Sequence, residues 1–454
     1  MGDKQIQKNE RNDLTQGKEW KVILRFAIPL LIGNLLQQTY TITDSIIVGQ
    51  FIGKEALAAI SASFFIYYFI ISLVIGIGSG TSVVVSQYFG AREYDKVQGA
   101  FSSFFIFMLG IGIVLSIGGI IFAEPIFRLT NTPEEVIPQA VAYFKIYIGG
   151  TFLFVTFNSV ISILRGIGES VKPMVFILIT TILNIALDLL FILVFKWGIE
   201  GAARATVIAQ GVGMCIALIY VNNTHPLLSI KKKDLLFNVK LFKEGLKIGL
   251  PTSVQQCAIA LGLIALLSIV NSFGTDTLTA YGAAGKVDTI ITQAILTLSG
   301  ALAAFAGQNI GAGKFNRVRR GLRFSLYVNA VFSALMFATI WFWGDTIMMA
   351  FTNDPQVISI GKEFLVITAG FLIFHGSLNV YNGALRGAGD TFFTMMTSLF
   401  SLWLIRIPLA YYLSGELGRS GIWWSIGLSI VIAFVFTYIY YKTGRWKKRC
   451  VVKR

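Results

Sequence analysis

Twelve long apolar segments constrain the fold of this chain more than any other feature. Crossing the hydrocarbon core of a bilayer as an α-helix takes about 20 residues, and each segment is long enough. Only 13% of the 454 residues are charged, whereas soluble proteins carry about 25%. We therefore predict an all-α integral membrane protein. Its twelve transmembrane helices are expected near residues 22–48, 57–85, 99–123, 138–162, 173–195, 199–221, 246–270, 278–306, 322–343, 362–383, 391–413 and 421–441.

Basic residues mark one side of the predicted membrane. Most lysines and arginines lie in the N-terminal tail, in the loops near residues 90, 167, 235, 315 and 387, and in the C-terminal tail. The loops between them are short and lean acidic. By the positive-inside rule, we expect a multi-pass protein of the plasma or inner membrane with both termini in the cytoplasm. The polar first twenty residues contain no secretory signal, so the first span is expected to be retained.

The net charge of +15 also raises the question of a nucleic-acid partner. Here the basic residues are spread over juxtamembrane loops, where they orient the protein and meet anionic lipid. We therefore expect membrane lipid and small-molecule substrates as partners, no nucleic acid, and a functional monomer. The three cysteines and two histidines form no metal-binding motif, and no phosphate-binding loop or nucleophile motif is present. We expect no enzyme activity and no cofactor.

An internal repeat organises the chain. FAIPLL, SQYFGAR and NSVISILRGIGE in the first half correspond to KIGLPTS, GQNIGAG and NVYNGALRGAGD in the second. Four landmark pairs are each 221 residues apart: Gly53 and Gly274, Gly90 and Gly311, Asn158 and Asn379, Arg165 and Arg386. Six spans per half make a parallel repeat, which in transporters puts the substrate site between the halves near the midplane.

The repeat also predicts the domain boundaries. We expect two homologous six-helix bundles at residues 22–222 and 246–442. A cytoplasmic N-terminal tail (1–21), a cytoplasmic linker (223–245) and a basic cytoplasmic C-terminal tail (443–454) complete the chain.

Residues 20–445 resemble the multidrug and toxic compound extrusion (MATE) transporters. The resemblance rests on Pro29 and Pro251 in the first helix of each half, YTITDSIIVG at 40–49, IGKEALAA at 52–59, and RGIGE and RGAGD at 165 and 386. It implies a V-shaped, alternating-access secondary transporter rather than an enzyme. Such a protein exports lipophilic, often cationic drugs or toxic metabolites in exchange for H⁺ or Na⁺. The resemblance also implies a helix bend at Pro29, and Pro251 is the proline in the first helix of the second half.

Asp44 stands out inside the first predicted span. Asn34, Gln37, Thr41 and Asp44 are spaced by three or four residues, so they line one stripe of the helix. An aspartate at the membrane centre costs about 2.5–3.5 kcal/mol on insertion scales, which argues that this stripe faces protein or water. The matching position of the second half is Ala265. The acid is therefore special to the first half and a candidate for chemistry.

Similar stripes occur on the fifth and sixth spans. Thr181, Asn184 and Asp188 follow one another at helical spacing, and Asp188 is matched by Leu409 in the second half. Two carboxylates, an amide and a hydroxyl supply oxygen ligands for a hard cation or a hydrogen-bonded set for a proton. Two neighbouring carboxyl groups would titrate as a coupled pair. The cation-coupling site implied by the resemblance, with Na⁺ as one occupant, comprises Asp44, Asn184, Asp188 and Thr206.

Other polar residues in the spans have an alternative explanation. Asn34, Thr181 and Gln210 taken singly are each explained by an interhelical hydrogen bond, worth about 0.6 kcal/mol on average. The second half lacks the glutamate that one branch of the family carries on the seventh helix; PTSVQQCAIA stands there instead. Coupling is therefore expected in the first half. The substrate cavity is expected to include Gln37, Tyr40, Asn158, Gln256, Asp288, Asn379 and Arg406.

Two other functions stay open at this point, as does the choice between H⁺ and Na⁺. A flippase for lipid-linked oligosaccharide, from the same superfamily, would need a wide basic cavity for a pyrophosphate, whereas the first half offers acids. A non-transporting receptor or scaffold is disfavoured by the parallel repeat and the acid pair.

Overall fold

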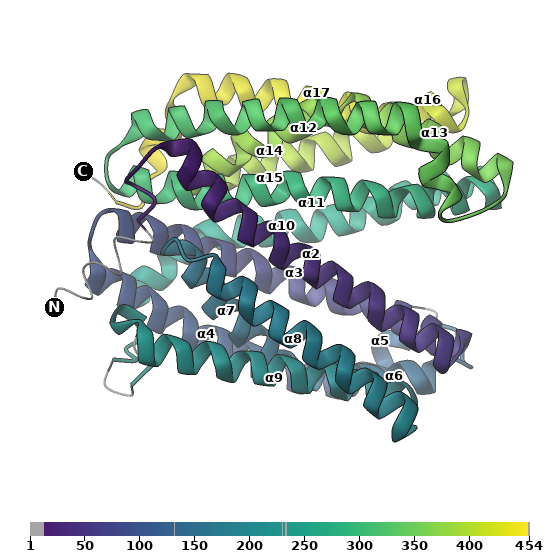
Figure 1. Ribbon diagram of the computed structural model, residues 1–454, viewed down its shortest axis with the longest axis horizontal. Helices are drawn as coiled ribbons and strands as arrows, with labels where there is room; N and C mark the ends of the chain where they lie inside the picture. The colour runs from purple at the N-terminus through teal and green to yellow at the C-terminus, as the bar shows by residue number, and fades with distance from the viewer. Residues whose placement is uncertain (1–12, 131, 229, 232–233, 453–454) are drawn as a thin grey trace. The chain divides into compact units, whose positions relative to one another are not determined.

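The chain folds into helices throughout the described residues, in this computed structural model. These residues are 13–130, 132–228, 230–231 and 234–452, so most of the predicted N-terminal tail lies outside them. Figure 1 shows the helices, coloured along the chain. The first half comprises α2 (Glu19–Phe51), α3 (Lys54–Gly90), α4 (Tyr94–Ile121), α5 (Ala123–Leu129), α6 (Ile137–Gly149), α7 (Thr151–Gly166), α8 (Val171–Leu189), η1 (Leu190–Val194), α9 (Gly198–Thr224) and η2 (Pro226–Leu228).

The second half repeats the pattern of the first. It comprises α10 (Val239–Asn271), α11 (Thr275–Gly311), α12 (Phe315–Met349), α13 (Pro355–Gly370), α14 (Leu372–Gly387), α15 (Thr391–Leu399), η3 (Phe400–Arg406), α16 (Ile407–Leu417), α17 (Arg419–Thr443) and η4 (Arg445–Arg449). The helix starts of α4 and α12, α7 and α14, and α9 and α17 are each 221 residues apart (315−94, 372−151 and 419−198). The offset seen in the sequence is thus an offset of structure.

The membrane-spanning helices match the expected number when two bent helices are counted. Within the described residues, ten helices are long and apolar enough to cross a bilayer, and the count reaches twelve if each bent pair is one span. The bent pairs are α6 with α7, at 45°, and α13 with α14, at 50°. The sequence predicted these as the continuous spans 138–162 and 362–383. The breaks fall at Gly150 and Phe371, each of which follows a glycine.

Two compact units divide the chain. Ile28–Gly249 form the first unit, and Asp13–Ala27 join the described residues from Leu250 onward in the second. Residues 22–27, which the sequence assigns to the first bundle, therefore pack with the second. Likewise the start of α10, up to Gly249, belongs to the first unit. Each repeat thus begins its first helix among residues of the other repeat.

Polar contacts hold these helix starts in place. In the second unit, the Leu14 amide donates to Gln308 Oε1 (2.9 Å), and Asn309 Nδ2 donates to the Leu14 carbonyl (3.1 Å). Glu19 forms ion pairs with Arg317 (3.3 Å) and Arg320 (3.0 Å). In the first unit, the start of α10 is bound by the Tyr88 hydroxyl, which donates to Glu244 Oε2 (2.7 Å). The starts of α2 and α10 are therefore bound by different kinds of residue in the two units.

A proline follows each division between units. Pro29 lies inside α2, two residues after Ala27, and Pro251 lies inside α10, two residues after Gly249. Proline has no backbone N–H, so each helix lacks one i→i−4 hydrogen bond there. This is the physical basis for the bend expected at Pro29 and Pro251, which stays a prediction.

The two apolar cores differ at matching positions. Trp423 is fully buried in the second unit, stacked on Tyr281 (centroids 5.6 Å apart, 4° between planes) and edge-on to Phe364 (4.9 Å, 84°). Subtracting 221 from these positions gives Ala202, Ile60 and Tyr143 in the first unit. A buried alanine therefore stands where the second unit carries its largest fully buried side chain.

Candidate functional site

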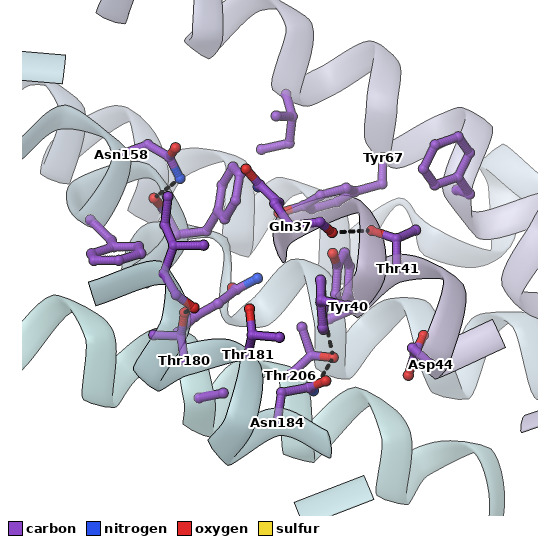
Figure 2. A pocket seen from close by; sticks show the side chains of 18 of the residues that line it. Gln37, Tyr40, Thr41, Asp44, Tyr67, Asn158, Thr180, Thr181, Asn184 and Thr206 are labelled. Atoms are coloured by element: carbon purple, nitrogen blue, oxygen red, sulfur yellow. Dashed lines mark hydrogen bonds between the residues drawn. The ribbon is translucent and has the colours of Figure 1, made fainter. Parts of the chain in front are cut away.

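A cavity of about 360 Å³ lies within the first unit. Side chains from α2, α3, α6, α7, α8 and α9 line it. The predicted residues Gln37, Tyr40, Asp44, Asn158, Asn184 and Thr206 are all among them (Figure 2). The structure thus brings together residues that are up to 169 positions apart in the sequence (206−37).

Thr206 on α9 is the centre of the polar network in this cavity. Its Oγ1 accepts a hydrogen bond from the Tyr40 hydroxyl (3.2 Å) and a longer one from Asn184 Nδ2 (3.4 Å). Figure 2 shows Tyr40 and Asn184 converging on Thr206 from α2 and α8. Because the amide nitrogen of Asn184 is used in this way, its carbonyl oxygen is left for another partner.

The two predicted acids are both buried. Asp44 is 8% exposed and Asp188 is 0% exposed. The carboxyl groups are close enough for each to act on the other directly, although no hydrogen bond of ordinary geometry joins them. Four buried oxygens have no hydrogen-bond partner in the described protein: Asp44 Oδ1, Asn184 Oδ1, and both carboxyl oxygens of Asp188. Leaving a buried polar atom unsatisfied costs about 1–3 kcal/mol, and more for a charged group.

Local helix geometry sets the position of Asp188. It is the penultimate residue of α8, and the chain continues directly into the π-helical turn η1. Single π turns inside helices are rare and occur often at functional sites. The wider turn changes the direction of every later side chain relative to Asp188. Asp44, by contrast, lies in an uninterrupted α-helical stretch of α2.

Three tyrosines that the sequence analysis did not single out line the same cavity. They are Tyr67 on α3 and Tyr143 and Tyr147 on α6. Tyr147 packs edge-on to Tyr67 (centroids 4.3 Å apart) and stacks with Tyr143 (5.6 Å). Tyr143 and Tyr147 both lie close enough to Asp44 to be affected by its charge. The spacing of four between Tyr143 and Tyr147 was a usable signal, because it places both rings on one helix face.

The far side of the cavity contains an amide and a cation. Asn158 on α7 lines the wall, and its Nδ2 donates to the Phe154 carbonyl (3.0 Å), so its amide oxygen is available to the cavity. Arg165, at the end of the same helix, also lines the cavity. Its Nε is buried without a hydrogen-bond partner in the described protein.

The second-half residues predicted for a substrate cavity are in the second unit, and none lines the first-unit cavity. Asn379 donates to the His375 carbonyl (2.9 Å) and its own carbonyl accepts from Ser299 (2.5 Å). Arg406 ends the π-helical η3 and donates to Ser429 Oγ (3.0 Å). Arg406 and Asp288 affect each other electrostatically. Gln256 is half-buried in α10. Their role in substrate binding stays a prediction.

The donor set of the first-unit cavity suits a small hard cation better than a transition metal. Among the described residues, no three His, Cys, Asp or Glu side chains are grouped as metal ligands. The unpartnered atoms are carboxylate and amide oxygens, the ligand type that hard cations prefer. A proton shared by the two carboxyl groups would also satisfy this set.

Membrane-crossing helices repeated in two units, with the buried acid Asp44 lining a cavity and Asp188 buried close to it, define a membrane transporter. The MatE family model matches residues 29–190 and, a second time, residues 251–412, so the chain belongs to the MatE family. Members of this family are secondary transporters rather than enzymes. The double match falls on the two repeats.

Several bacterial transport and drug-resistance proteins align with most of this chain. The probable multidrug resistance protein YpnP of Bacillus subtilis strain 168 is 33% identical over 442 residues, 96% of this chain and 97% of that protein. The probable multidrug resistance protein NorM of Thermotoga maritima is 25% identical, covering 96% of this chain and 94% of that one. An FAD transporter of Shewanella oneidensis is also 25% identical, covering 88% of this chain and 89% of that protein.

Solved structures share the fold. An outward-facing multidrug resistance MATE family transporter of the MOP superfamily superimposes with a TM-score of 0.89 at 23% identity, covering 96% of this chain and 98% of that one. A MOP superfamily transporter from Pyrococcus furiosus gives a TM-score of 0.88 at 23% identity, with 95% and 97% covered. The predicted all-α fold of repeated six-helix bundles is thereby confirmed.

Proposed function

We propose that this chain is a cation-coupled antiporter that exports lipophilic, often cationic small molecules across the cell membrane by alternating access. The observation that carries the proposal is the group of four unpartnered oxygens on Asp44, Asn184 and Asp188, buried beside a tyrosine-lined cavity. Ionisable residues inside membrane proteins are rare and mark ion pathways and proton relays. The coupling site proposed is Asp44, Asn184, Asp188 and Thr206.

The coupling ion and the substrate would compete for the same negative charge. With both carboxyl groups ionised, the cavity attracts a cationic substrate, and the surrounding aromatic rings add cation-π and apolar contacts. A proton or Na⁺ that enters from outside neutralises the acids and removes this attraction. The substrate is then released outward. Tyr40 lies one turn before Asp44, lines the cavity and donates to Thr206. Ion binding at the site would therefore change the position of a side chain in the cavity wall.

One coupled ion is enough to support useful export. A single charge that moves down 100 mV gains about 2.3 kcal/mol, which corresponds to roughly a fifty-fold concentration ratio at 1.4 kcal/mol per tenfold. No cofactor is needed. The membrane potential and the ion gradient supply the free energy.

The names of similar proteins support the export of drugs but do not restrict the substrate. YpnP and NorM are named as probable multidrug resistance proteins, whereas the Shewanella relative is named an FAD transporter. We propose a drug-like cation as substrate because Asp44 lines the cavity with Asp188 buried close to it, against one lining arginine, Arg165. The comparisons do not favour the oligosaccharide flippase.

Transport in proteoliposomes tests the proposal. Purified protein is reconstituted with ethidium, and export is driven in separate runs by a pH gradient and by a Na⁺ gradient. We expect one of the two gradients to drive export by the native chain and to be dissipated by added substrate. Asp44→Asn is expected to abolish this coupling, because an amide cannot exchange a proton or hold Na⁺ as a charged ligand.

A matched control uses an exposed acid of the same chain. Asp276, in the first turn of α11, is exposed, and Asp276→Asn should leave export unchanged. If Asp44→Asn retains full export while substrate still dissipates the gradient, the coupling assignment is wrong.

We also propose that both termini lie in the cytoplasm and that a monomer is sufficient for transport. The basic segments at 231–233 and 445–449 support this orientation through the positive-inside rule. Cysteines introduced singly at Lys448 and at Glu134, and labelled with a membrane-impermeant maleimide in intact cells, test it. Only the cysteine at position 134 should react. Reaction at position 448 alone would show that the C-terminus lies outside the cell and that the proposed orientation is wrong.

A further inference from the structure

A second cavity lies in the second unit, and its lining residues are all different from those of the first-unit cavity. It has a volume of about 370 Å³ and is lined by residues of α12, α14, α17 and η4. These helices lie together in the second unit in Figure 1, where α14 contacts both α12 and α17. Gly444, at which the chain turns after α17 ends at Thr443, is among the residues that line the cavity.

Four cations line this cavity. Arg319 and Arg323 are one helical turn apart on α12, and Lys442 and Lys447 come from the end of α17 and from η4. No acidic side chain is among the lining residues. Within the described chain, none of the four cations forms an ion pair with a carboxylate. Like charges gathered without a counter-charge repel one another, so the group calls for an anionic partner.

Aromatic rings form the floor of the cavity. Tyr381 and Trp446 are buried, 6% and 3% exposed, and Tyr441 stacks on Trp446 with ring centroids 5.2 Å apart. Lys442 Nζ lies 5.3 Å from the centre of the Tyr438 ring, and Lys447 Nζ lies 6.0 Å from that of Trp446. Such contacts hold the lysine heads in position above an apolar floor. The result is an apolar aromatic floor with cationic side chains at its edge.

The matching place in the first unit is built in the opposite way. Positions 221 residues before Arg319 and Arg323 are Gln98 and Ser102 on α4, and those before Tyr381 and Lys442 are Val160 and Val221. The two neutral side chains bind the linker between the halves: Gln98 Nε2 and Ser102 Oγ donate to the Asp234 carbonyl at 3.3 and 2.9 Å. The scaffold therefore closes this site in one repeat and leaves it open and cationic in the other.

We infer that the cavity bounded by Arg319, Arg323, Lys442 and Lys447 binds a phosphate group. Arginine pairs with phosphate oxygens through two parallel hydrogen bonds, and lysine adds a point charge. Basic pockets between membrane helices are suited to anionic lipid head groups, and the aromatic floor offers an apolar surface beside the charge. The phosphate has two possible sources, an anionic phospholipid or a soluble phosphate. This site is separate from the proposed coupling site and does not depend on it.

The test converts the cationic site into its first-half counterpart. In the variant Arg319→Gln/Arg323→Ser, each arginine is replaced by the residue found 221 positions earlier. Full-length native and variant proteins are incorporated into phosphatidylcholine nanodiscs, with and without phosphatidylglycerol, and retained lipid is counted by native mass spectrometry. The variant should bind phosphatidylglycerol roughly thirtyfold more weakly than the native protein, because each basic residue that faces an anionic lipid contributes about fivefold in affinity.

A second measurement distinguishes the two sources. Inorganic phosphate is added to protein in phosphatidylcholine nanodiscs, with sodium chloride at equal ionic strength as the reference, and the unfolding temperature is recorded. A rise with phosphate that the double variant loses, without preferential phosphatidylglycerol retention, supports the site with a soluble phosphate as its ligand. Retention of phosphatidylglycerol that the double variant loses supports a lipid.

The control variant is Arg445→Gln/Lys448→Ser, which removes two exposed basic residues of η4 that do not line the cavity. It should behave as the native protein does. If the double arginine variant does not fold, shown by a lower unfolding temperature in phosphatidylcholine alone, Lys442→Gln/Lys447→Gln is measured in its place. Equal binding of both probes by the native protein and by the folded variants, or equal loss in the control, overturns the inference.

Discussion

The two units share a scaffold but differ in what fills their interiors. The first unit places Asp44 and Thr206 at its cavity, whereas the matching positions of the second are Ala265 and Gly427. A Cβ atom at Gly427 would lie 2.1 Å from the Phe371 ring. No threonine fits there. The second unit has packed an aromatic ring into the place where the first keeps a hydrogen-bonding hydroxyl.

The same contrast holds at the aromatic cluster. Ile60 and Tyr143 line the first cavity, whereas their counterparts Tyr281 and Phe364 are packed against Trp423. A duplicated backbone has therefore kept one interior open and polar and filled the other. The helices are repeated in the two units, whereas the polar side chains of the first cavity are not.

The largest expected effect is on coupling. Asp188→Asn should reduce the steady-state substrate ratio of proteoliposomes from up to about fifty-fold toward one, because a single coupled charge supplies that ratio. Asp288→Asn, in the second unit, should leave most of the ratio intact. Substrate accumulation under a fixed gradient measures both. Equal losses would mean that the two units contribute alike, and the asymmetry would fail.

The filled interior of the second unit should be sensitive to truncation. Trp423→Ala is expected to lower the free energy of unfolding by about 3–5 kcal/mol, the usual cost of emptying a large aromatic site. Trp343→Ala, at a residue that is 58% exposed, should change it by about 0.5 kcal/mol or less. Unfolding in mixed micelles by denaturant titration provides the values. A small loss at Trp423 would show that the site collapses around the gap.

A glycine in the second unit tests the same difference in packing. A Cβ at Gly376 would lie 1.6 Å from Asn329 Oδ1, and Asn329 donates to the Ile373 carbonyl (3.1 Å). The first-unit counterparts, Val155 and Met108, meet without this constraint. Gly376→Ala should therefore cost about 1–3 kcal/mol.

Its control is Gly282→Ala, because Gly282 is also helical and has no atom within 4 Å of a built Cβ. That change should stabilise the helix by about 0.5–1 kcal/mol. Thermal unfolding of the two variants side by side decides the matter. The two changes in unfolding free energy are expected to have opposite signs. A loss of stability at both positions would contradict the packing argument.

The smallest effect is expected at a turn that both units contain. Gly313 has φ 73°, and the matching residue Arg92 adopts φ 62° with a side chain. Since one repeat already accepts an arginine there, Gly313→Ala should cost no more than about 1–2 kcal/mol. A greater loss of unfolding free energy would show that the turns differ in more than sequence.

Much of the fold followed from patterns that physics makes unambiguous. Apolar length gave the spans, and the constant offset gave the repeat. The bends at Gly150 and Phe371 did not follow, because a hydropathy pattern is continuous through a change of helix direction. Of the predicted stripe, Gln37, Thr41 and Asp44 line the cavity and Asn34 is not among the lining residues, while the function of the site stays a prediction. Tyr67 and Tyr147 were missed because aromatic residues in a membrane span usually face lipid or packing, and only tertiary contacts distinguish them.

The π-helical turns explain a further limit of matching the halves by a fixed offset. η1 begins at Leu190, two residues after Asp188, but η3 begins at Phe400, eleven residues before the position that matches Leu190. Because a π turn is wider than an α turn, side chains that lie between these two points of the repeat point in different directions in the two halves. The counterpart of Asp188 in space is therefore Leu409 or a neighbour. Pro408 and Ala410 are also uncharged, so the contrast between the units is unaffected.

The contacts of the N-terminal segment have a consequence for synthesis of the chain. Leu14 and Glu19 are among the first described residues to leave the ribosome, yet their partners Gln308, Asn309 and Arg317 follow nearly 300 positions later. Domains generally fold as they emerge, N-terminal first. Here the opening turns of α2 must wait, unpaired, until α11 and α12 are made. A first half expressed alone would carry an unfinished helix start, whereas a second half would lack only a short peptide that can be supplied separately.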